Sequence, residues 1–111
     1  MGVTGLDENL RAILAELRRH FEGLYGLRLV RLVLFGSQAR GDAEPGSDID
    51  VLVVLKGPVD QGNESARSIG FVADLSLRFD TVVSCIYMDE ERYLRRNGPL
   101  LRNIRKEGIA V

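Results

Sequence analysis

The chain has 111 residues, of which 45% are hydrophobic and 28% are charged. This length is typical of one domain, and this balance of residues excludes a disordered chain. The formal net charge of −1 argues against a protein that coats nucleic acid by bulk electrostatics. Because no apolar run approaches roughly 18 residues, no secretory signal is visible and Cys85 is the one cysteine, we expect a cytoplasmic protein without a membrane span.

Apolar residues in the first half of the chain follow the periods of helices and strands. Three- and four-residue spacing predicts a helix over residues 6–24, and the run RLVRLVLF predicts a buried strand over residues 28–35. A polar stretch follows, in which Ser37 is expected to cap a short helix of residues 38–40. The run IDVLVVL then predicts a second strand over residues 49–55.

The second half continues the alternation of helices and strands. Apolar residues at helical spacing predict a helix over residues 63–79, and residues 81–88 form a third predicted strand. Asp89 is expected to cap a short helix, and Pro99 to begin a last helix that ends at Gly108. The apolar residues that indicate the helix over 63–79 are Ala66, Ile69, Val72, Ala73 and Leu77.

This order of elements predicts an α/β (α+β) fold, with a small mixed β-sheet on which helices pack, in one domain over residues 1–111. The strands predicted over residues 28–35 and 49–55 are too close in sequence for a helical crossover. We therefore expect them to pair antiparallel.

The segment between the first two strands carries the residues with chemical significance. The first strand stops at Gly36-Ser37, where a short helix begins. Glycine lets the backbone approach a phosphate, the serine hydroxyl is a donor, and the start of a helix presents unpaired amide groups. These features together predict an anion-binding turn.

Asp48 and Asp50 flank the first residue of the second strand. Residues two apart on a strand share a face, so the two carboxylates repel one another unless a cation lies between them. Hard oxygen ligands beside a phosphate favour Mg²⁺, and two such ions can share a carboxylate pair. Each feature alone has a plain structural explanation, a turn or a solvated loop, whereas their combination favours nucleotidyl or phosphoryl transfer.

The sequence GSQARGDAEPGSDID resembles the signature of the polymerase-β-like nucleotidyltransferase superfamily. Gly36-Ser37, ten intervening residues and Asp48-Ile49-Asp50 match its pattern of Gly-Ser followed by Asp-x-Asp. The flanking Ala39-Arg40-Gly41 and Ser47 are similar to the version in the small stand-alone members, the minimal nucleotidyltransferases. The similarity in element order extends over nearly the whole sequence and implies the nucleotidyltransferase fold.

The resemblance implies a nucleotide site. Gly36 and Ser37 would hold the triphosphate of ATP, and Asp48 and Asp50 would bind two Mg²⁺ ions and act in catalysis.

Arg40 and Ser47 are assigned to the same nucleotide site. For Arg40, a salt bridge to Asp42 or Glu44 is an equally good interpretation, because exposed arginines usually do little more.

Active members of the superfamily carry a third carboxylate on a following strand, and here its position stays open. Asp80 is the candidate catalytic residue, with a role in ending the preceding helix as the alternative. Residues 80, 82, 84 and 86 share a face of the predicted strand, so Ser84 is a second candidate for the position. If Ser84 lies there, catalysis is slow or absent.

The resemblance also implies a partner. Stand-alone members are often paired with a helical HEPN-domain toxin, which they neutralise as antitoxins, in some systems by transferring AMP to it. The basic segment Arg92–Lys106 contains no acid and is a candidate docking surface, with a solvated amphipathic helix as the alternative. The rival to an active transferase is a binding module of the same fold that acts by contact alone. Assembly into a homo-oligomer is left open.

Overall fold

The structure is a computed structural model that describes residues 8–41 and 47–111. Helices and strands alternate along the chain, as the sequence predicts. The helices are α1 (Glu8–Tyr25), the 3-10 helix η2 (Gly26–Arg28), α2 (Ser37–Arg40), α3 (Gln61–Phe79), α4 (Glu90–Arg95) and α5 (Pro99–Glu107).

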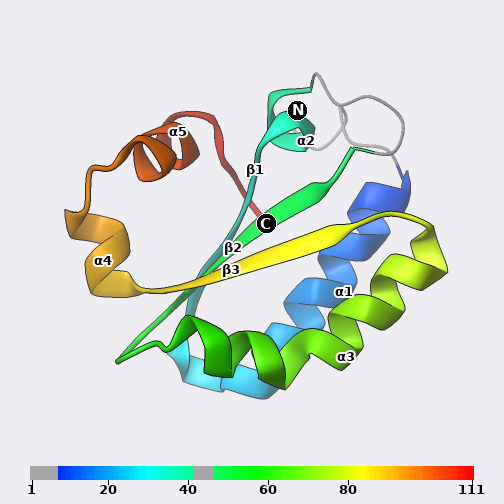
Figure 1. The fold of residues 1–111 in the computed structure, drawn as a ribbon, viewed down its shortest axis with the longest axis horizontal. Coiled ribbons are helices and arrows are strands. Elements are labelled where there is room, and N and C mark those ends of the chain that lie inside the picture. The colour runs from blue at the N-terminus through cyan, green and yellow to red at the C-terminus, as the bar shows by residue number, and fades with distance from the viewer. Residues whose placement is uncertain (1–7, 42–46) are drawn as a thin grey trace.

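Four strands form one mixed sheet in the order β3-β2-β1-β4 (Figure 1). Strand β1 (Leu29–Phe35) pairs antiparallel with both β2 (Ile49–Leu55) and β4 (Ile109–Ala110), whereas β3 (Val83–Asp89) runs parallel to β2. The predicted mixed sheet and the antiparallel pairing of its first two strands are confirmed. Strand β4 is not predicted, because two residues are too few to show a hydrophobic period.

Helices cover both faces of the sheet. Helices α1 and α3 lie side by side on one face, and α4 and α5 lie on the other (Figure 1). Since β2 is buried on both faces, all its residues from Val51 to Leu55 are buried and its sequence is apolar without alternation. Alternate residues of β2 enter different clusters: Val53 packs with α1 and α3, and Leu52 packs with Leu101 and Ile104 of α5.

The predicted helix ends agree with the structure in part. The start of the helix expected over residues 6–24 lies outside the described residues, and α1 ends at Tyr25. Asp89 caps α4 as predicted, since its side chain accepts a hydrogen bond from the amide of Arg92 at 2.7 Å. The prediction that Ser37 caps α2 is wrong: the N-cap is Gly36, and Ser37 is the first helical residue.

Helix α3 is confirmed, but most of the apolar residues that indicate it face outward. Ile69 is 65% exposed and Leu77 is 83% exposed, whereas Glu64 and Ser68 are buried. We call the exposed residues Ala66, Ile69, Ala73 and Leu77 the apolar stripe of α3.

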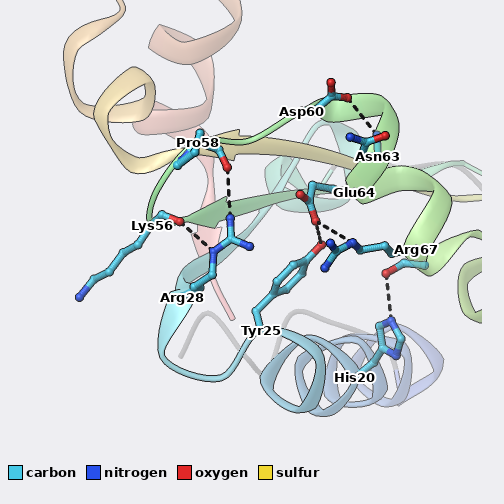
Figure 2. Close-up of polar contacts among 10 residues, drawn as sticks. His20, Tyr25, Arg28, Lys56, Pro58, Asp60, Asn63, Glu64 and Arg67 are labelled. Atoms are coloured by element: carbon cyan, nitrogen blue, oxygen red, sulfur yellow. Dashed lines mark hydrogen bonds and ion pairs between the residues drawn. The ribbon is translucent and has the colours of Figure 1, made fainter.

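The buried polar residues of α3 are tolerated because each has a partner on α1 (Figure 2). The hydroxyl of Tyr25 donates to Oε1 of Glu64 at 2.7 Å. The Oγ atom of Ser68 lies 3.0 Å from Nε2 of His20. The polar face of α3 therefore contributes to the interface between the two helices and leaves the apolar stripe exposed.

Candidate active site

The turn after β1 lies against the first residues of β2. Phe35, the last residue of β1, pairs with Asp50 across the antiparallel ladder. Gly36 has φ 77° and ψ −160°, a combination that is essentially restricted to glycine. A Cβ atom added to Gly36 would lie 2.6 Å from Oδ2 of Asp50. Glycine is therefore needed both for the backbone conformation and for the approach of this carboxylate to the turn.

Helix α2 begins directly at this turn. The carbonyl of Gly36 accepts hydrogen bonds from the amides of Ala39 at 3.1 Å and Arg40 at 3.2 Å. The amides of Ser37 and Gln38 precede these first intrahelical donors. Together with the Ser37 hydroxyl, they form a set of donors suited to phosphate oxygens.

The two predicted carboxylates lie together at the start of β2. Asp48 is exposed and immediately precedes the strand, and Asp50 is half-buried within it. Partial burial, and then the negative charge of Asp48, raise the pKa of Asp50 above its usual value. The two acids are thus close enough to repel one another. A bound cation would offset both the partial burial of the Asp50 carboxylate and its repulsion by Asp48.

The donor set fits Mg²⁺ held jointly with a substrate. Within residues 8–41 and 47–111, no three or more His, Cys, Asp or Glu side chains are grouped as a metal site. Two carboxylates are nevertheless sufficient for Mg²⁺, which commonly keeps several waters and takes its remaining ligands from phosphates. Asp48 and Asp50 are the residues that could hold it.

Strand pairing gives the register of β3, which the sequence pattern leaves open. Ser84 pairs with Asp50 in the parallel ladder, so its exposed side chain lies beside Asp50 on the same face of the sheet. Asp80 lies before β3, as the C-cap of α3, in the left-handed conformation at φ 50°. Its amide donates to carbonyls of the last turn of that helix. This geometry supports the helix-ending role of Asp80 and puts a hydroxyl in the position beside Asp50.

Arg40 and Ser47 flank the site through contacts that sequence reasoning does not anticipate. The guanidinium of Arg40 forms an ion pair with Glu107 of α5 at 3.4 Å. The alternative partners, Asp42 and Glu44, lie outside the described residues. The Nε2 atom of Gln38 donates to the carbonyl of Ser47 at 3.3 Å, which ties α2 to the chain that leads into Asp48. No local sequence signal marks Glu107, because it lies 67 residues from Arg40.

The basic segment Arg92–Lys106 is only partly available for a partner. Arg105 donates to the carbonyls of Tyr93 and Arg96 and to the side chain of Asn97, so it holds α4 and α5 together. These contacts make Arg105 a structural residue. Arg102, in contrast, is exposed on α5.

Comparisons with known proteins place the chain in a family. The family model for the nucleotidyltransferase domain matches residues 10–111. Two proteins of Methanocaldococcus jannaschii each bear the name "putative protein adenylyltransferase". One is 34% identical to this chain over 67% of this chain and 74% of its own length. The other is 36% identical over 76% of this chain and 79% of its own length. None of the helices that the structure describes is long and apolar enough to cross a membrane.

Solved structures share the fold. A "putative nucleotidyltransferase" from Sulfolobus solfataricus has a TM-score of 0.61 and 23% identity, over 98% of this chain and 84% of that one. A toxin-antitoxin structure with AMP-PNP has a TM-score of 0.54 and 20% identity, over 75% of this chain and 60% of that one. The toxin-antitoxin MntA-HpeT, solved as a mutant, has a TM-score of 0.56 and 19% identity, over 87% of this chain and 70% of that one. The predicted fold class is thereby confirmed.

Proposed function

The chain belongs to the nucleotidyltransferase domain family, and we propose that it transfers AMP from ATP to a hydroxyl group of a partner protein. The observation that carries this proposal is the contact between the turn at Gly36 and the carboxylate of Asp50. It brings a set of phosphate-binding donors and a pair of acids to one end of the sheet, which is the arrangement that transfer of a nucleotide requires.

In this mechanism each part of the site has a separate task. The turn at Gly36 and Ser37 binds the triphosphate, with Arg40 and Ser47 at its border, and Asp48 and Asp50 would hold Mg²⁺. Mg²⁺ bound by these two acids would supply positive charge to stabilise the developing negative charge on the phosphates. The acceptor oxygen forms a bond to the α-phosphorus while the bond from that phosphorus to the β-phosphate oxygen breaks. Pyrophosphate leaves, and the hydroxyl proton passes to solvent or to a neighbouring base.

The adenine nucleotide and the protein acceptor are supported by similarity. The relatives from M. jannaschii are named for protein adenylylation, and one structural neighbour was solved with AMP-PNP. Two neighbours are toxin-antitoxin structures, which supports a partner protein. We propose that the acceptor is a helical toxin of the HEPN class and that this chain is its antitoxin.

Transfer is tested with ATP labelled at the α-phosphate and the partner protein. We expect Mg²⁺-dependent labelling of the partner by the wild-type chain and none by the double variant Asp48→Asn, Asp50→Asn. The double variant keeps the size of both side chains, and its circular dichroism should match the wild type. Equal labelling by both proteins would rule out the proposed site.

A second function, neutralisation by contact alone, is favoured by one observation. Ser84 pairs with Asp50, and we propose that it occupies the position at which the superfamily resemblance implies a third carboxylate. A hydroxyl there is a weaker base and metal ligand than a carboxylate. Under this alternative the partner is unlabelled and the Asp48→Asn, Asp50→Asn variant still neutralises it. A growth assay that co-expresses the partner with each variant separates the two functions.

A further inference from the structure

Glu107 lies near the turn at Gly36, although the two residues are far apart in the sequence. Strand β4 pairs with the end of β1, with Ile109 opposite Leu34. Glu107 precedes Ile109 by two residues, and Gly36 follows Leu34 by two residues. Because the two strands are antiparallel, both positions lie at the same end of the pair. The sheet therefore brings the last residue of α5 to the candidate active site.

The backbone that carries Glu107 is held by close packing. Ile104, one turn earlier on α5, is buried in the cluster that covers this face of the sheet. The amide of Gly108 donates to the carbonyl of Ile104 at 2.7 Å. A Cβ atom added to Gly108 would lie 2.5 Å from Cγ1 of Val33 on β1. Packing this tight fixes the point from which the Glu107 side chain extends.

Stability alone does not explain an acid at this position. Glu107 forms an ion pair with Arg40, but the two side chains are 35% and 43% exposed, and ion pairs this open to solvent contribute little to stability. The end of a helix also favours cations, such as Arg105 and Lys106 in the last turn of α5, over an acid. A role toward Arg40 accounts for Glu107 better than a role in the helix.

The ion pair involves the helix that covers the face from which Asp50 projects. Asp50 and Leu52 share a face of β2, and Leu52 packs with Ile104 of α5. An isolated carboxylate near this site would repel a triphosphate, and the guanidinium of Arg40 offsets that charge. The planar guanidinium has five N–H donors, so one arginine can hold a carboxylate and contact a phosphate at the same time.

We infer that Glu107 is a positioning residue that holds the guanidinium of Arg40 beside the turn at Gly36, where Arg40 contacts the triphosphate. The inference rests on the proposed function for the identity of the ligand. It gives the end of α5 a task in nucleotide binding, separate from any role of the basic segment Arg92–Lys106 toward a partner.

Calorimetric titration with AMP-PNP in the presence of Mg²⁺ tests the inference on the intact chain. We expect Arg40→Ala to weaken binding by about tenfold or more, and Glu107→Ala to weaken it by roughly three- to fivefold. Glu107→Gln keeps a hydrogen-bond acceptor for Arg40, so its affinity should stay within about twofold of the wild type.

Glu91→Ala is the matched control. It removes an ion pair with Arg95 of the same 3.4 Å length. Glu91 lies near Asp89, which pairs with Leu55 at the end of β2 remote from Asp50. We expect this variant to bind AMP-PNP as the wild type does, and all the single variants at positions 91 and 107 to match the wild type in urea unfolding.

Two further measurements separate positioning from a merely structural role. In the Arg40→Ala background, Glu107→Ala should cause no further loss of affinity, because no guanidinium remains to be held. Without nucleotide, NMR relaxation of the Arg40 Nε–H group should show a more mobile side chain in Glu107→Ala than in the wild type or in Glu91→Ala.

Three results would overturn the inference: wild-type or tighter binding by Glu107→Ala, an equal further loss in the Arg40→Ala background, or unchanged mobility of the Arg40 side chain. Failure of the wild-type chain to bind AMP-PNP with Mg²⁺, with the mobility of Arg40 still dependent on Glu107, would instead count against the proposed function. The two failures are therefore distinguishable.

Discussion

Gly36 is the residue on which the geometry of the site depends most. Its backbone lies in a region that other residues enter only with strain, and its missing side chain leaves room for the carboxylate of Asp50. Either requirement alone would favour glycine. Both together mean that the turn and the acidic pair cannot be changed independently.

Gly36→Ala should therefore reduce both stability and nucleotide binding. The strained backbone costs about 1–3 kcal/mol of the free energy of unfolding, and the new Cβ also displaces the Asp50 carboxylate. Gly57→Ala is the control, since Gly57 has φ 82° but a Cβ there would meet no atom within 4 Å. Urea unfolding and titration with Mg²⁺ and ATP should show a stability loss in both variants but lost nucleotide affinity only in Gly36→Ala. Unchanged affinity in that variant would contradict this view of the turn.

Ser84 offers a test by gain of function. Its side chain is exposed beside Asp50, so a carboxylate is tolerated there without burial of a charge. We expect Ser84→Asp to raise the rate of AMP transfer by about 10²-fold or more, the lower end of the range for general acid–base catalysis.

Asp80→Asn is the matched comparison for Ser84→Asp. It should leave transfer unchanged, because Asp80 ends helix α3 before β3 begins. If Asp80→Asn abolishes transfer and Ser84→Asp adds nothing, Asp80 supplies the third carboxylate after all.

At the scale of elements, the connection between α4 and α5 depends on Arg105. Its guanidinium donates to the carbonyl of Arg96 at 2.7 Å and to Oδ1 of Asn97 at 3.0 Å, and it lies over the ring of Tyr93. We expect Arg105→Ala to lower the free energy of unfolding by about 1 kcal/mol, because its hydrogen bonds and its contact with the Tyr93 ring are lost. Arg102→Ala should change it by no more than about 0.5 kcal/mol. Equal stability of the two variants by urea unfolding would show that Arg105 is not structural.

The interface between α1 and α3 should make stability depend on pH through His20, the chain's one histidine. Its ring stacks on Phe71 at 4.0 Å and lies 3.0 Å from Oγ of Ser68; burial lowers its pKa from 6.5. Glu16 and Arg19 border the same hollow and carry opposite charges. Because the pKa of His20 is lower in the folded chain, the unfolded chain binds the proton more readily. The contribution of neutral His20 to the free energy of unfolding is therefore lost as the pH falls below about 6.5.

Urea unfolding at about pH 7.5 and pH 5.5 measures this contribution of His20. The wild type should lose stability between the two, and His20→Asn should lose less. An equal loss in the two proteins would assign the pH dependence to other groups.

At the scale of the whole molecule, much of the fold is predictable because its apolar runs are continuous. The runs at residues 29–35 and 49–55 contain enough β-branched residues to identify buried strands, and their short separation requires antiparallel pairing. The sequence does not provide the register of β3 against β2, because Asp80 and Ser84 share a face in any strand that contains both. Nor does it show which face of α3 is buried, because the partners of Glu64 and Ser68 come from α1.

The candidate site is predictable to a similar degree. The Gly-Ser and Asp-x-Asp elements are separated by only ten residues and lie together because β1 and β2 are consecutive antiparallel strands. The ion pair of Arg40 with Glu107 joins residues far apart in the chain, and only the folded structure reveals it.

The account depends most on one claim, that the turn at Gly36 and the acids Asp48 and Asp50 together bind a nucleotide with Mg²⁺. Thermal unfolding tests it directly, because a ligand that binds only the native state raises the midpoint of unfolding. At 100 times the dissociation constant, Mg²⁺ with ATP should stabilise the wild-type chain by about 2.7 kcal/mol, and the Asp48→Asn, Asp50→Asn variant should show no comparable shift. An unchanged wild-type midpoint at millimolar Mg²⁺ and ATP, or an equal shift in the variant, would contradict the claim.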